Sequence, residues 1–299
     1  MKHTIKVTGA LVLLFFIAQL VGLLIINQYI DHKKTIETKG VVFKPLPYGF
    51  ERPDVQNKSI SFIYITISIL IGTFLALILI RFEKQFIWRS VFFIAVWSTL
   101  SIAFAAFINP IAALIIGLVV SILRLLRPNA IIQNLSEVFI YGGLAASLVN
   151  IFNLFAAFML LIVISIYDFV AVFKTKHMIE LAEFQSKSKV FAGLLIPYEK
   201  QKISFNINPK PAPKEQKTRV AVLGGGDIGF TLIFAGVVMK DIMLQTTVLA
   251  GFLKTLIIPV FAAIALLILL LKGQQNKFYP AMPVLSIGCF IGYLVVALI

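Results

Sequence analysis

Long apolar runs separated by polar segments dominate the hydrophobic pattern of this chain. Nine such runs can be drawn, and most approach the roughly 20 residues that an α-helix needs to cross a bilayer. They cover residues 8–30, 59–80, 86–108, 110–126, 130–149, 154–173, 219–239, 246–271 and 280–299. A transmembrane β-barrel would instead show short segments of alternating polarity. The pattern therefore predicts an all-α polytopic membrane protein with nine transmembrane helices.

Two longer polar stretches interrupt the runs, at residues 31–58 and 174–218. We expect one membrane domain, in which residues 1–153 supply helices one to five and residues 154–299 supply helices six to nine. The 174–218 stretch is a basic loop with an apolar island at residues 190–196. We expect this island to lie on the membrane surface or to plug a cavity between the helices.

The composition excludes whole classes of protein. The chain has 299 residues, of which 60% are hydrophobic and 13% are charged, and its mean hydropathy is +0.97. Neither a soluble globular enzyme nor a disordered chain has such values. The single cysteine, Cys289, excludes an internal disulfide, and the three histidines show no ligand-pair spacing or HExxH motif. We therefore expect no metal and no other cofactor.

The basic excess, a net charge of +14, indicates how the chain sits in the membrane. With nine spans, 19 of the 27 Lys and Arg residues fall on the side of the N-terminus and seven on the other side. The positive-inside rule then predicts a cytoplasmic N-terminus and an external C-terminus, with lipid rather than nucleic acid as the partner of the basic residues. The remaining cation, Lys254, lies inside the eighth run. It is expected to extend toward the interface, with a pairing to Glu137 as the alternative.

Two carboxylates lie inside predicted spans, where ionisable residues are rare and costly. Asp168 precedes the loop residue Lys174 by six positions, and Asp227 follows Arg219 by eight. In helices these spacings correspond to about 9 and 12 Å from the same membrane face. Two such carboxylates at one depth can share a proton and hydrolyse an amide as aspartyl proteases do. The alternative is a proton- or cation-coupled transporter or channel that uses the same carboxylates.

The neighbours of the aspartates indicate close approach of a second backbone. Asp227 follows the glycines at 224–226, which each weaken a helix by about 1 kcal/mol relative to alanine but admit another chain. The β-branched run at 218–223 is suited to a strand edge that an extended substrate would pair with. Close helix packing is the alternative explanation for the glycines.

Three motifs together resemble one protein family. Tyr167-Asp168, Gly224-x-Gly226-Asp227 and Pro280-Ala281-Met282 stand in the order and on the spans typical of the presenilin and signal-peptide-peptidase intramembrane aspartyl proteases. The resemblance implies a presenilin-like fold and hydrolysis of peptide bonds within the transmembrane helices of protein substrates.

The resemblance also implies roles for individual residues. Asp168 and Asp227 would be the catalytic pair, and Tyr167 would pack or hydrogen-bond beside Asp168. The site-shaping and substrate-binding residues would be Gly224, Gly225, Gly226, Pro280, Ala281 and Met282. Met282 replaces the leucine of the family's Pro-Ala-Leu motif, which puts fine specificity in doubt more than activity.

Orientation and length indicate a branch of the family. The predicted orientation is similar to that of presenilins and opposite to that of signal peptide peptidases. The compact chain, with no long acidic insertion in its large loop, resembles a microbial homologue. By this resemblance it would lie in a microbial cell membrane and would not require accessory subunits.

Overall fold

A computed structural model describes residues 4–38, 40–127, 129–175, 184, 188, 190–198, 220–273 and 279–299. The N-terminal helices are α1 (Ile5–Tyr29), α2 (His32–Thr38), α3 (Ser61–Arg81), α4 (Gln85–Ala105), α5 (Pro110–Leu126) and α6 (Ala130–Leu148). The C-terminal elements are α7 (Leu154–Val170), β1 (Gly193–Pro197), β2 (Val220–Gly224), α9 (Gly225–Ile242), α10 (Val248–Thr255), α11 (Ile257–Lys272) and α12 (Met282–Leu298). Short 3-10 turns cover Pro47–Gly49, Lys58–Ile60 and Val149–Ile151, and a π-helical turn covers Ala171–Thr175.

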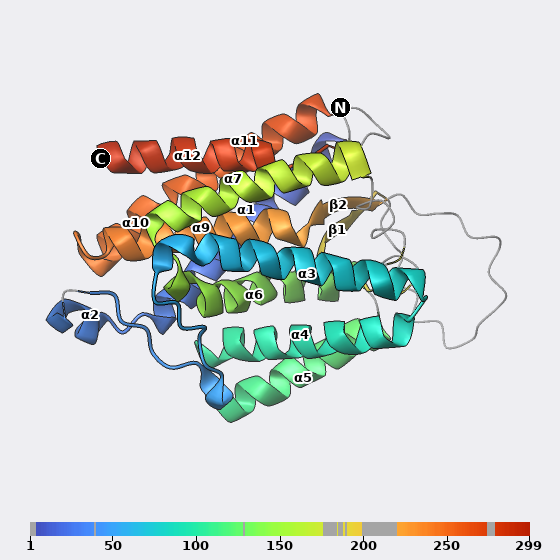
Figure 1. The fold of residues 1–299 in the computed structure, drawn as a ribbon, viewed down its shortest axis with the longest axis horizontal. Coiled ribbons are helices and arrows are strands. Elements are labelled where there is room, and N and C mark those ends of the chain that lie inside the picture. The colour runs from blue at the N-terminus through green and yellow to red at the C-terminus, as the bar shows by residue number, and fades with distance from the viewer. Residues whose placement is uncertain are drawn as a thin grey trace.

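The long helices run side by side in one bundle, and β1 and β2 lie at one end of it (Figure 1). Each predicted apolar run contains a helix: α1, then α3 to α7, then α9, α10 with α11, and α12. The all-α prediction is therefore confirmed for the described residues, apart from the two short strands. Asn109 and Asn153 cap α5 and α7 by accepting the amide hydrogens of Ile111 and Ala156.

Length and apolarity mark the helices that can cross a bilayer. Within the described ranges, five meet both criteria: Ile5–Tyr29, Lys58–Arg81, Gln85–Ala105, Leu154–Lys174 and Val248–Lys272. Pro110–Leu126 and Met282–Leu298 are shorter apolar helices. Helices α6 and α9 fall outside these criteria because they contain more polar and charged residues, and many of their residues are buried against other helices.

The seventh and eighth runs differ from their predicted form. In the seventh run the helix begins only at Gly225, because the β-branched residues before it form β2. The eighth run is divided at Leu256 into α10 and α11. Pro259 accounts for the division, since it cannot donate to the carbonyl of Thr255 and its ring crowds that group.

Much of the apolar island at 190–196 forms a strand inside the protein, so the first of the two alternatives, a position on the membrane surface, is wrong. Its residues from Gly193 onward form β1, which pairs antiparallel with β2 in a register that sets Gly193 opposite Gly224. Val190 and Leu194 are buried in the protein. Burial between helices removes the apolar side chains from water, and pairing with β2 supplies hydrogen bonds to the backbone N–H and C=O groups. At the membrane surface these backbone groups would have no strand partner.

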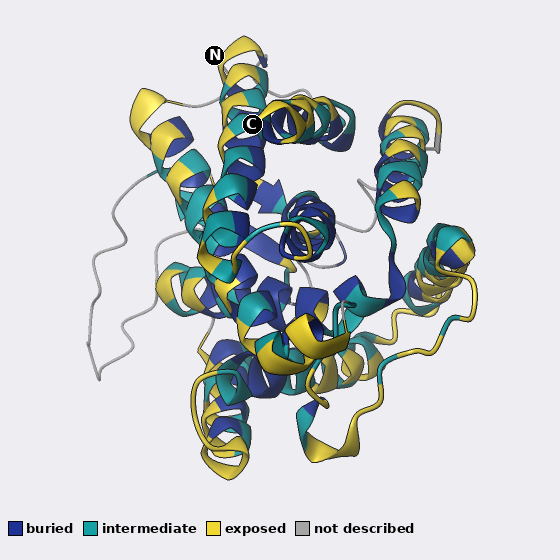
Figure 2. Ribbon diagram, turned by 90° about the vertical axis from the view of Figure 1, so that its left-hand side faces the viewer, coloured by how far each residue is buried: buried dark blue, intermediate teal, exposed yellow. Residues whose placement is uncertain are grey.

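Buried residues line the centre of the bundle and exposed ones its outer surface (Figure 2). Helix α9 is the most enclosed of the C-terminal helices, with nearly every residue from Ile228 to Lys240 buried. Helix α1 packs against α6, α9 and α11. In contrast, only Ser61 and Ala76 are buried in α3, and much of its apolar surface faces outward. This arrangement encloses the polar chemistry of α9 and leaves the apolar surface of α3 for lipid.

Candidate active site

Asp168 lies in the last turn of α7, where its side chain is buried. The backbone N–H of Met282, the first residue of α12, donates to Asp168 Oδ2 at 3.1 Å. A helix N-terminus carries unpaired N–H groups and a partial positive charge, so it stabilises a carboxylate there. The fold thus brings the Pro280–Met282 motif to the first aspartate, as the resemblance implies.

A second contact sets how α7 and α12 face each other. The hydroxyls of Ser165 and Ser286 lie 2.8 Å apart, and Ser165 is three residues before Asp168 on the same face of α7. Neither serine is among the site residues that the sequence motifs predict. Their position within apolar spans is itself an indication of such a contact, because polar residues there commonly form hydrogen bonds between helices.

Asp227 occupies the first turn of α9, directly after β2 and the glycines. A Cβ atom on Gly224 would lie 3.2 Å from Asp227 Oδ2, which is tighter than ordinary van der Waals contact. The absence of a side chain at position 224 therefore leaves the room in which the carboxylate lies. Asp227 lies in the first turn of its own helix, where a negative charge is favoured, whereas Asp168 meets the N-terminus of a neighbouring helix, α12.

The other two glycines differ in what surrounds them. A Cβ on Gly225 would approach the Tyr141 hydroxyl to 2.6 Å, so α6 packs directly against this backbone. A Cβ on Gly226 would meet only the ring of Phe230, at 3.5 Å, and Gly226 is exposed. Gly225 is thus required for packing inside the protein, whereas Gly226 leaves its face open.

Gln19 ties α1 to the first turns of α9. Its amide nitrogen donates to the Ile228 carbonyl at 2.9 Å and to Thr231 Oγ1 at 2.7 Å, and its side chain is fully buried. Ile228 follows Asp227 directly, so this bond fixes the backbone beside the carboxylate. Gln19 is not among the site residues that the sequence motifs predict, although it is a polar residue within the first apolar run.

Tyr167 links the first motif to α3. Its hydroxyl lies 3.0 Å from Thr73 Oγ1. The sequence predicted a contact beside Asp168 and contained no sign of this link to α3.

Helices α7, α9 and α12, which carry the three motifs, pack against one another. One carboxylate, the buried Asp168, contacts the N-terminus of α12, and the other, Asp227, lies in the first turn of α9. A pair of carboxyl groups can activate a water and polarise a carbonyl. Among the described residues, no group of three or more His, Cys, Asp and Glu side chains is arranged to hold a metal ion.

Comparison with known proteins agrees with this arrangement. Residues 12–299 match the family model described as "Signal-peptide peptidase, presenilin aspartyl protease". No curated protein shows significant sequence similarity to the chain.

Two solved structures share the fold. Both are titled as a presenilin family intramembrane aspartate protease, one in space group C222 and one in P2. Each is 18% identical to this chain and superposes with a TM-score of 0.60 over 97% of it, covering 98% and 96% of the respective solved chains. These matches give no support to the transporter alternative. With a family model that spans nearly its whole length, this integral membrane chain belongs to the signal-peptide peptidase and presenilin family of aspartyl proteases.

Proposed function

We propose that this protein hydrolyses peptide bonds within transmembrane helices, with Asp168 and Asp227 as its general acid and base. The observation that carries the proposal is the bond from Met282 N–H to Asp168, which joins one family motif to another at a buried carboxylate. Asp227 supports it from the adjacent α9, with its carboxylate in the space beside Gly224.

The reaction needs no group beyond the two carboxylates and water. The ionised aspartate takes a proton from water as the oxygen attacks the amide carbon, and the protonated aspartate donates to the carbonyl oxygen. The resulting gem-diol collapses when the amide nitrogen is protonated, and the C–N bond breaks to release an amine and a carboxylic acid.

A substrate helix must unwind before one of its peptide bonds can be attacked, and the extended segment needs backbone partners. Strand β2 is suited to this role, because the sheet is two-stranded among the described residues and Val220 and Val222 are exposed. An extended peptide that adds to the free edge of β2 would run toward Gly224 and Asp227. The β-branched run would thus bind the substrate as its sequence predicts.

The residues near the carboxylates complete the proposed site. Gly224, Gly225 and Gly226 would shape it beside Asp227, and Pro280 and Ala281 would border it beside Asp168. Tyr167 would act through its contacts around α7 and α3.

The proposed orientation is a cytoplasmic N-terminus and an external C-terminus, supported by the distribution of Lys and Arg. The natural cysteine, Cys289, is buried, so cysteines introduced at exposed positions can report on which side of the membrane each loop lies. In intact cells, a membrane-impermeant maleimide should label Asp54→Cys and leave Arg127→Cys unlabelled. The reverse pattern would contradict this orientation.

The catalytic test uses the purified protein alone in liposomes with a transmembrane-helix reporter. Wild-type protein should cleave it, whereas Asp168→Asn and Asp227→Asn should not, with thermal stability retained. Asp54→Asn is a matched control, because Asp54 is exposed and lies in the 31–58 stretch. Cleavage by either aspartate variant at the wild-type rate would refute the proposal, and cleavage only with added subunits would refute the proposed independence from them.

A further inference from the structure

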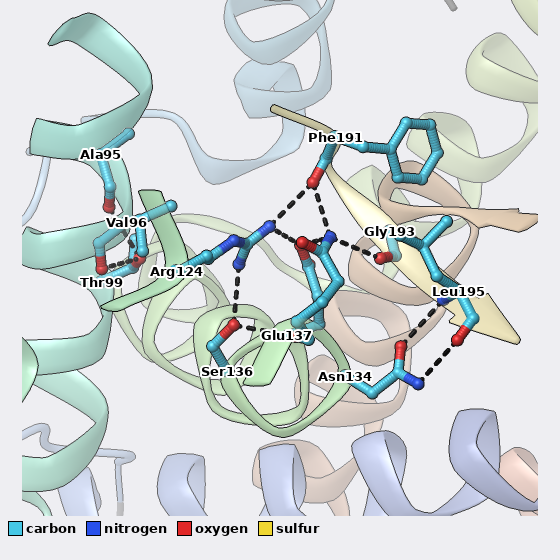
Figure 3. Close-up of polar contacts among 11 residues, drawn as sticks. Ala95, Val96, Thr99, Arg124, Asn134, Ser136, Glu137, Phe191, Gly193 and Leu195 are labelled. Carbon is cyan, nitrogen blue, oxygen red and sulfur yellow. Dashed lines mark hydrogen bonds and ion pairs between the residues drawn. The ribbon is translucent and has the colours of Figure 1, made fainter. Parts of the chain in front are cut away.

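Five buried or partly buried polar residues of α5 and α6 form a hydrogen-bonded cluster beside β1, and Figure 3 labels Arg124, Asn134, Ser136 and Glu137 among them. This α5–α6 polar cluster consists of Arg124, Gln133, Asn134, Ser136 and Glu137. Arg124 and Glu137 form an ion pair whose side chains are only 5% and 2% exposed. Buried charges of this kind are costly unless further hydrogen bonds satisfy them. The other hydrogen bonds of the cluster therefore show which part of the protein it binds.

The other hydrogen bonds of the cluster go to the backbone of every second residue, from Phe191 just before β1 to Leu195 within it. The Phe191 carbonyl accepts from Arg124 Nη2 at 2.8 Å and from Gln133 Nε2 at 2.7 Å. The Gly193 carbonyl accepts from the same Gln133 nitrogen at 3.0 Å. The spacing of two residues means that one edge of the strand is bound throughout.

Asn134 binds β1 as a neighbouring strand would (Figure 3). Its Nδ2 donates to the Leu195 carbonyl at 2.7 Å, and its Oδ1 accepts the Leu195 N–H at 2.8 Å. Paired strands exchange the same two bonds between opposed residues. The outer edge of β1 is therefore closed by side chains, and within the part of the chain that the structure describes only β2 offers an edge to another chain.

This closure determines how β2 is presented. Leu195 lies opposite Val222, and because its backbone groups turn toward Asn134, those of Val222 turn toward the open edge of β2. The backbone groups of Gly224, which lies opposite Gly193, also turn toward this open edge, because the direction of these groups repeats every two residues along a strand. The open edge thus ends three residues before Asp227.

Gly193 holds the register between the strands. Its φ of +146° is a conformation that side chains disfavour, and a Cβ there would approach the Leu223 carbonyl to 2.3 Å. A slip of one residue would bring a residue with a side chain to this point and turn every side chain of the strand to the opposite face. The bonds from Gln133 to the carbonyls of Phe191 and of Gly193 itself oppose such a slip.

We propose that the α5–α6 polar cluster is a positioning site for proteolysis. It sets the register of β1 on β2 and thereby the position of Asp227 relative to the scissile bond. Glu137 contributes by orienting both donors, since it pairs with Arg124 and accepts from Gln133 at 3.3 Å. This inference rests on the proposed function, because it assigns residues that act on the candidate catalytic aspartate through the sheet.

The test replaces Asn134, whose two bonds belong to β1 alone, with leucine and with aspartate. Asn134→Leu removes both bonds, whereas Asn134→Asp keeps an oxygen for the Leu195 N–H. Asn109→Leu is the matched control, because Asn109 binds the backbone at the start of α5, away from the sheet. Three quantities are measured: hydrogen exchange in peptides covering 190–198, the kcat and KM for a helical reporter, and the cleavage positions by mass spectrometry.

Asn134→Leu should exchange faster over 190–198 and should cleave at neighbouring bonds as well as at the wild-type bond. A misplacement of about 1 Å can lower the rate about a hundredfold, so kcat should fall by up to that factor. KM should stay within about twofold of wild type, because the transition state and not binding is affected. Asn134→Asp should be intermediate, and Asn109→Leu should match wild type in cleavage positions.

The outcomes separate this inference from the function on which it rests. If wild-type protein cleaves no transmembrane reporter, the proposed function is refuted and the positioning role with it. If wild type is active and Asn134→Leu retains its kcat and cleavage positions, only the positioning role is refuted, whatever the exchange data show. Should Asn134→Leu fail to fold, Asn134→Asp and Arg124→Lys give the same decision by the same measurements.

Discussion

The backbone N–H of Met282 and the carboxylate of Asp168 lie in hydrogen-bond contact at 3.1 Å, across two helices that are more than 100 residues apart in the chain. The contact comes from the main chain at the start of α12, so it does not depend on which side chain occupies position 282. This explains how the motif can contain methionine where the family has leucine.

Met282→Leu should leave activity within about threefold of wild type, because the N–H is kept and the swap conserves volume, at a cost below about 1.5 kcal/mol. Cleavage of a transmembrane reporter and thermal unfolding in detergent measure the two effects. Asp168→Asn is the contrasting variant, since an amide oxygen can still accept this bond but cannot act as an acid or base. Loss of stability in Asp168→Asn with activity retained would contradict the assignment.

Alanine substitutions at the three glycines should have different consequences. Gly225→Ala should destabilise the protein by about 1–3 kcal/mol, because the new methyl overlaps the Tyr141 hydroxyl. Gly224→Ala should lower kcat about tenfold or more with a smaller loss of stability, because it displaces the carboxylate of Asp227. Gly226→Ala should unfold like wild type, since its methyl meets only ordinary contacts.

The control for this series is the double variant Gly225→Ala with Tyr141→Phe. Removing the hydroxyl relieves the contact at 2.6 Å but leaves ring atoms at 3.1 and 3.2 Å, so stability should return only in part. Equal stability of all three alanine variants would contradict this packing.

The ion pair of Arg124 and Glu137 should be asymmetric under mutation. Glu137→Leu leaves a buried guanidinium without its partner and should cost about 3–5 kcal/mol. The double variant Arg124→Met with Glu137→Leu removes both charges and should be more stable than Glu137→Leu. Denaturant unfolding in detergent measures the difference, and a double variant less stable than the single one would show that the hydrogen bonds of Arg124 outweigh its charge.

Two lysines, Lys240 just after the seventh predicted span and Lys254 within the eighth, should respond differently to replacement by methionine. Lys240 is buried, and its ammonium donates to the carbonyls of Val149 and Phe152 at the end of α6. Lys240→Met leaves these carbonyls without that donor and should cost about 1–3 kcal/mol. Lys254 does not pair with Glu137, whose partner is Arg124, and instead donates to the Ile299 carbonyl at 3.2 Å in an exposed contact.

Lys254→Met is thus a matched control and should change the free energy of unfolding by less than about 0.5 kcal/mol. Thermal unfolding of both variants under the same detergent conditions is the measurement. Equal losses would contradict the structural role given to Lys240.

The sequence by itself determined the helical class, the family and the identity of the candidate site. Apolar runs near the thickness of a bilayer leave few alternatives to helices, since backbone groups in lipid must be satisfied internally. The costly carboxylates Asp168 and Asp227 stand out within such runs, and the motifs around them identify the family.

Only the tertiary structure decided how those residues are held. Nothing local predicts that Met282 meets Asp168, or that Gln19 binds beside Asp227, because these contacts join segments far apart in the chain. The island at 190–196 was misassigned for the same reason: its partners, Asn134 and β2, come from distant segments. Periodicity reports which face of a segment is apolar, whereas strand pairing and buried hydrogen bonds depend on which segments the fold brings together.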